Sequence, residues 1–127
     1  MKLLHKIALT TGLIAGATLV RAEVIALQFD AKARFERDVV VAPGKFVEVC
    51  GALPAGALVQ WRYEAAAALD FNIHYHVGSE VHYPNKLNGA AVGHGMLKAE
   101  TAQDYCWMWT HKGKAPVTLQ LRLTRAD

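Results

Sequence analysis

Hydrophobic and polar residues alternate along most of the chain from residue 23 onward, with the period of two that is typical of half-buried β-strands. The clearest example is segment 70–77, where Phe71, Ile73 and Tyr75 are separated by polar residues that include His74 and His76. Further strand-like segments, rich in alternating, β-branched or aromatic residues, are 25–29, 39–41, 45–50, 58–64, 80–83, 105–110 and 117–124.

Short turn signals separate these segments. They are Pro43-Gly44, 54–56, 78–80, Pro84-Asn85 and 111–116, rich in the glycine and proline that turns favour. The four alanines 65–68 could continue a strand or make a turn, and the glycine-rich segment 88–98 is predicted to be a loop. Seven or eight short strands at this spacing predict an all-β protein, an antiparallel β-sandwich of a jelly-roll-like kind, with no internal repeat.

The first 22 residues have the pattern of a secretory signal peptide. Lys2 and Lys6 precede an uncharged run, 7–20, and Ala22 offers a small residue at the cleavage point. An uncleaved anchor is the alternative, but it needs about 20 apolar residues, and this run is shorter and diluted by threonine and glycine. Cleavage after Ala17 is a weaker option. We therefore expect a signal peptide, 1–22, and a single domain, 23–127, in the periplasm or secreted, with no membrane span after cleavage.

The predicted signal peptide changes the charge of the chain. It holds Lys2, Lys6 and Arg21 and no acidic residue, so 11 of the 14 basic residues remain to face 11 acidic ones. A mature domain near neutrality argues against nucleic acid or an anionic membrane surface as a partner.

Two cysteines, Cys50 and Cys106, lie in the predicted domain. An even number of cysteines in a small exported domain favours a disulfide. The alternative is a pair of thiolate metal ligands, which an oxidising compartment disfavours.

Three pieces of the sequence resemble the GOLD domain, a β-sandwich of early-secretory cargo receptors. Segment 46–56 resembles that family's first cysteine strand and turn, 59–63 with 70–73 and Gly78 its central strands, and 105–109 with 117–123 its closing strands. The resemblance implies a sandwich whose disulfide joins Cys50 to Cys106, and a binding module rather than an enzyme. It does not imply the trafficking function, because no coiled coil or transmembrane helix follows these strands.

The candidate chemistry lies in a group of histidines. His74 and His76, two apart on a strand, place two imidazoles on one face. His94 and Met96 could add a third imidazole and a thioether, a combination that suits copper better than zinc. His82 would share the face of His76 if the intervening turn had three residues and would lie on the opposite face if it had two. The alternative is that these histidines are only a solvated polar face.

No catalytic motif is present: there is no Gly-x-Ser-x-Gly, phosphate loop or His-Glu-x-x-His, and Ser79 is the chain's single serine. The sequence thus predicts a non-enzymatic, exported metal-binding protein for copper (or zinc) carriage, buffering or sensing. Its metal ligands would be His74, His76, His82, His94 and Met96. The alternative is a metal-free GOLD-like module that binds a protein or peptide.

Overall fold

The computed structural model describes Gly12 and residues 23–126, so the predicted signal peptide lies outside the described residues apart from Gly12. Seven strands account for most of the described chain, and no helix among these residues is long and apolar enough to cross a membrane. The strands are β1 (Glu23–Ala26), β2 (Arg34–Val41), β3 (Phe46–Leu53), β4 (Leu58–Val77), β5 (Glu80–Lys98), β6 (Gln103–Thr110) and β7 (Val117–Ala126).

The long strand β4 pairs with three other strands, β5, β6 and β7. Its first half, Leu58–Ala65, pairs with β7, and its later part, Asp70–His74, pairs with β6, while β5 runs beside both. The register shifts between Glu64 and Leu69, where β4 turns from one neighbour to the other. The four alanines 65–68 therefore lie within the strand.

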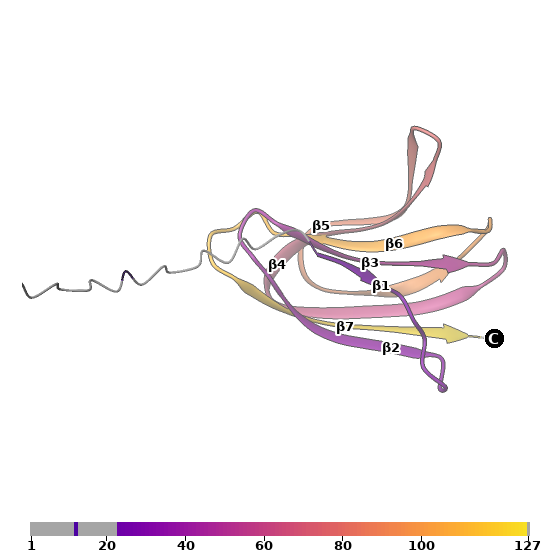
Figure 1. The fold of residues 1–127 in the computed structure, drawn as a ribbon, viewed down its shortest axis with the longest axis horizontal. Coiled ribbons are helices and arrows are strands. Elements are labelled where there is room, and N and C mark those ends of the chain that lie inside the picture. Colours follow the sequence, from indigo (N-terminus) through magenta and orange to yellow (C-terminus); the bar gives the residue numbers. More distant parts are fainter. Residues whose placement is uncertain (1–11, 13–22, 127) are drawn as a thin grey trace, which may run out of the picture.

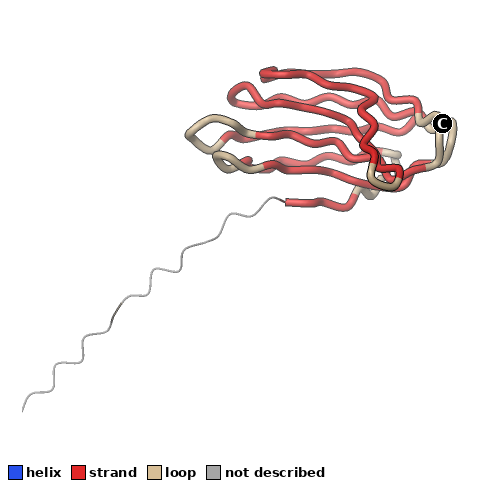
Figure 2. The backbone as a smooth tube through the Cα atoms, turned by 90° about the horizontal axis from the view of Figure 1, so that it is seen from above, coloured by secondary structure: helices blue, strands red, loops and turns tan. Residues whose placement is uncertain are grey.

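This bend folds one sheet, in the order β1-β3-β6-β4-β7-β2 with β5 on β4, into two layers (Figure 1). All pairs are antiparallel except β1 with β3. Figure 2 shows the strands running side by side with the loops gathered at their ends. The predicted all-β, sandwich-like fold class is confirmed.

Aromatic rings fill the space between the layers. Trp61 and Tyr63 from the first half of β4 meet Phe71 from its second half, with ring centroids 4.7 and 5.1 Å from that of Phe71. Trp109 on β6 packs against Phe71 at 5.3 Å and edge-on against Tyr63 at 5.6 Å. These contacts cross the bend, so the aromatic residues both fill the core and fix the angle between the layers.

The glycine-rich segment 88–98, predicted to be a loop, is part of β5, and that prediction is wrong. Gly93 pairs with Tyr63, and Gly95 pairs with Trp61. A Cβ atom on Gly93 would lie 2.5 Å from Cε1 of Tyr63, and one on Gly95 would lie 2.7 Å from Cζ2 of Trp61. The glycines leave room for two large rings that lie across the neighbouring strand.

The predicted disulfide is present. Cys50 on β3 and Cys106 on β6 are directly opposite one another, with their Cα atoms 4.1 Å apart and a bond between the sulfurs. The alternative of two thiolate ligands is therefore not realised. Closing a loop across 56 residues stabilises the fold by about 4 kcal/mol in the chain-entropy model.

Candidate functional site

The end of the β4–β5 hairpin projects away from the two layers (Figure 1). We call residues 75–83 the hairpin tip. Strand β6 reaches β4 only as far as His74, so beyond that residue β4 has β5 alone as a hydrogen-bonded neighbour. A two-residue turn closes the hairpin, with Val77 paired to Glu80 and Gly78 at a φ of 58°, a conformation that glycine adopts without strain.

Apolar side chains are exposed on this projection. Val77 is 46% exposed, Val81 38% and Tyr83 47%. The ring of Tyr83 carries the ammonium group of Lys86 over its face, 3.9 Å from the centroid, an arrangement that favours a fixed orientation of the ring. Val81 lies opposite His76 on one face of the hairpin and Val77 lies on the other face, so both faces of the projection expose apolar side chains.

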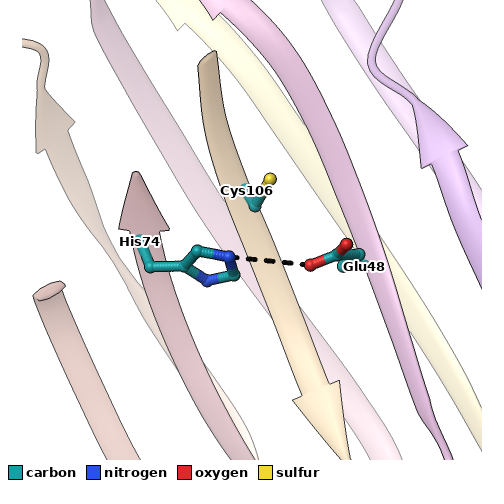
Figure 3. A group of neighbouring side chains, drawn as sticks. All are labelled: Glu48, His74 and Cys106. Carbon is teal, nitrogen blue, oxygen red and sulfur yellow. Dashed lines mark ion pairs between the residues drawn. The ribbon is translucent and has the colours of Figure 1, made fainter. Parts of the chain in front are cut away.

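At the base of the hairpin tip, His74 is buried on the outer face of the sheet. Its Nδ1 lies 2.7 Å from Oδ1 of Asn72, and its Nε2 lies 3.7 Å from a carboxylate oxygen of Glu48. Figure 3 shows His74 and Glu48 reaching toward one another across β6, beside the sulfur of Cys106. With Nδ1–H donating to Asn72, the Nε2 atom faces Glu48.

Burial sets the protonation of this group. Burial lowers the pKa of the His74 imidazole, and the neighbouring His76 lowers it further. Burial also raises the pKa of the Glu48 carboxyl, with His76 acting in the opposite direction. Both shifts favour the neutral forms of the two groups, as expected where charge is costly to bury.

The five predicted metal ligands are not brought together. His74 and His76 share the outer face, with ring centroids 5.3 Å apart. The two-residue turn places His82 on the opposite face, where its ring stacks on Tyr75 at 5.0 Å. His94 and Met96 pair with Arg62 and Gln60 in the first half of β4, in the other part of the hairpin.

Within the described part of the chain, one group of three His, Cys, Asp or Glu side chains has ligand atoms within 4.8 Å of one another, namely Glu48, His74 and Cys106. The sulfur of Cys106 is bonded to Cys50, so it is not a thiolate ligand. This group therefore differs from the predicted site in its members and lacks a metal-binding sulfur.

No family model matches the chain, and no curated protein matches it. Solved structures do match. PliG from Aeromonas hydrophila, a periplasmic lysozyme inhibitor of g-type lysozyme, has a TM-score of 0.64 at 11% identity over 84% of this chain and 98% of its own. PliG from Salmonella Typhimurium gives 0.56 at 10% identity over 83% and 99%, and an Escherichia coli PliG mutant gives 0.53 at 10% over the same shares. At these identities the likeness shows the fold.

These matches correct the predicted function. Copper carriage, buffering or sensing is wrong as the main interpretation, because the structural relatives are inhibitors that act on a protein. Their descriptions agree with the predicted periplasmic location and with a non-enzymatic protein. The GOLD resemblance is supported only as far as a β-rich fold, and copper or zinc as a cofactor stays a prediction.

The hairpin tip was not predicted from the sequence as a site. The pattern predicts segment 70–77 as a half-buried strand and segment 80–83 as another short strand. The available signal was Val77 and Val81 close to both sides of a glycine turn. That signal shows an apolar hairpin end, but not that the neighbouring strand stops before it.

Proposed function

We propose that this chain is a periplasmic inhibitor that binds a lysozyme through its hairpin tip. The observation that carries the proposal is the projecting hairpin on which Val77, Val81 and Tyr83 are exposed. The fold it shares with the PliG inhibitors supports the choice of partner. The broader alternative, a metal-free protein-binding module, uses the same surface without naming the enzyme.

The shape and chemistry of the hairpin tip suit an enzyme cleft. The projection is only two strands wide and carries side chains on both faces, a shape that suits insertion into a groove. Aromatic and aliphatic anchors that become fully desolvated supply most of the binding energy in protein interfaces. A hairpin seated in the cleft would keep the substrate away from the pair of carboxylates on which glycoside hydrolysis depends.

The test is inhibition of a purified g-type lysozyme, followed as clearance of a bacterial cell-wall suspension, with calorimetry for the affinity. Residues 23–127 should inhibit, and Val77→Asp and Val81→Asp should each weaken inhibition at least tenfold, because a buried unpaired carboxylate is costly. Val40→Asp on β2 is the matched control, since Val40 is also an exposed valine, and it should inhibit like the wild type.

The outcomes separate the two parts of the proposal. No inhibition of g-type lysozyme at micromolar protein would refute the choice of partner. Inhibition that Val77→Asp and Val81→Asp leave unchanged would refute the hairpin tip as the contact surface. A c-type lysozyme assayed in parallel reports the specificity.

A further inference from the structure

A concave site lies at the base of the hairpin and shares Tyr75, His82 and Tyr83 with the hairpin tip. It is a cleft of about 440 Å³ whose lining includes Tyr75, His82 and Tyr105 together with Lys98 and Glu100. Its volume is within the range of small-molecule sites, which combine aromatic lining with a few polar groups. The proposed inhibition assigns no role to its charged lining residues, Lys98 and Glu100.

One wall of the cleft is a row of three rings from three adjacent strands. Tyr105 on β6 lies 5.1 Å from Tyr75 on β4, between ring centroids. Tyr75 in turn lies 5.0 Å from His82 on β5, with the two planes within 8° of parallel. The Tyr105 hydroxyl donates to the carbonyl of Thr101 at 2.9 Å, which ties the row to the loop at the rim.

The rest of the lining supplies opposite charges. Lys98 ends β5, and Glu100 follows in the adjoining loop; both side chains are exposed. Neither takes part in an ion pair among the described residues. Tyr105 is 1% exposed and Tyr75 is stacked between its two neighbours, so the ring that the cleft offers is that of His82, which is 45% exposed. Lys98 adds three ammonium hydrogens to donate and Glu100 a carboxylate to accept.

We propose that this cleft binds a pyranose ring of an oligosaccharide. A pyranose has a flat face of C–H groups, which carry slight positive charge and pack on the negative faces of aromatic rings. Its hydroxyls project from the edge and need both donors and acceptors, which Lys98 and Glu100 provide. An extended peptide would be held mainly by main-chain hydrogen bonds, which a wall of rings does not offer.

The experiment is an NMR titration of residues 23–127 with two probes, the tetrasaccharide of N-acetylglucosamine and cellotetraose. At least one should shift the signals of Tyr75, His82 and Lys98. His82→Ala should weaken that affinity at least fivefold, whereas His82→Phe, which keeps a ring, should stay within twofold of the wild type. His94→Ala, an exposed histidine elsewhere on β5, is the matched control and should bind normally.

A second variant is needed because a substitution of His82 could alter the hairpin structure itself. Glu100→Gln lies outside the strands and should weaken binding by removing the charged acceptor. The proposal is overturned if neither sugar shifts the cleft signals at 10 mM, or if His82→Ala and Glu100→Gln both bind like the wild type. Shifts produced by the tripeptide Gly-Trp-Gly but by neither sugar would also overturn it and identify a peptide site.

Discussion

His74 shows how a residue on a polar face becomes buried. The alternation of segment 70–77 places it opposite the core, where it is expected to be either solvated or a metal ligand. The side chain is instead 6% exposed, because Glu48, Cys106 and Tyr83 from three neighbouring strands surround it. Its surroundings come from residues 26 positions before and 32 after it in the chain, which no local pattern predicts.

The first prediction is that His74 makes the stability of the protein depend on pH. Burial lowers its pKa in the folded protein, so just below the usual value of 6.5 the unfolded chain binds more protons than the folded one. The free energy of unfolding must then fall as pH decreases through 6.5 toward the lower folded pKa. His74→Gln should flatten this slope between pH 7.5 and 5.5, measured by urea unfolding.

Glu48 affects the stability in the opposite direction. Its pKa is raised from 4.5 by burial, so its contribution to stability is lost as pH rises from 4.5 through the folded value.

The control for His74→Gln is His94→Gln, at an exposed position, which should keep the wild-type slope of the free energy of unfolding between pH 7.5 and 5.5. Equal slopes in His74→Gln and the wild type would contradict the burial argument.

At the scale of elements, the β4–β5 hairpin decides both the core and the candidate site. Its inner part bends between the layers and packs Trp61 and Tyr63 over the glycines of β5. Its outer part continues past the end of the pairing with β6 and forms the hairpin tip. One pair of strands therefore builds the core at one end and is exposed at the other.

The second prediction concerns the glycines of β5. Gly95→Ala should lower the free energy of unfolding by about 1–3 kcal/mol, the usual cost of overpacking a core. The added methyl group would meet the ring of Trp61, a buried side chain packed against Phe71. Val92→Ala, at an exposed neighbouring position, should change it by less than about 0.5 kcal/mol. Urea unfolding measures both, and a Gly95→Ala protein as stable as the wild type would show that the ring moves aside freely.

At the scale of the whole molecule, the features fit a small exported binding protein. The disulfide joins the middle of two adjacent strands of one layer and persists in oxidising compartments. The predicted domain carries equal numbers of acidic and basic residues, so no net charge attracts it to a charged partner.

The third prediction is export with cleavage after Ala22. The expressed full-length chain should be recovered outside the cytoplasm with Glu23 as its first residue, because signal peptidase accepts the small Ala22 at the end of the uncharged run. Intact-mass spectrometry measures this directly. A mass that includes Met1 would contradict it, and cleavage after Ala17 would give a distinct, larger mass.

The sequence by itself determined the fold class, the faces of most strands and the partner of each cysteine. These follow from the period-two alternation of residues such as Phe71, Ile73 and Tyr75, and from there being two cysteines. Tertiary structure decided that segment 88–98 forms a strand, in which Gly93 and Gly95 leave room for the rings of Tyr63 and Trp61 on the neighbouring strand. It also decided that His82 turns away from His76, because the length of one turn sets the face. The projection of Val77 and Val81 depended on where β6 stops pairing with β4. The pairing of two strands that lie far apart in the sequence cannot be predicted from the local sequence of either strand.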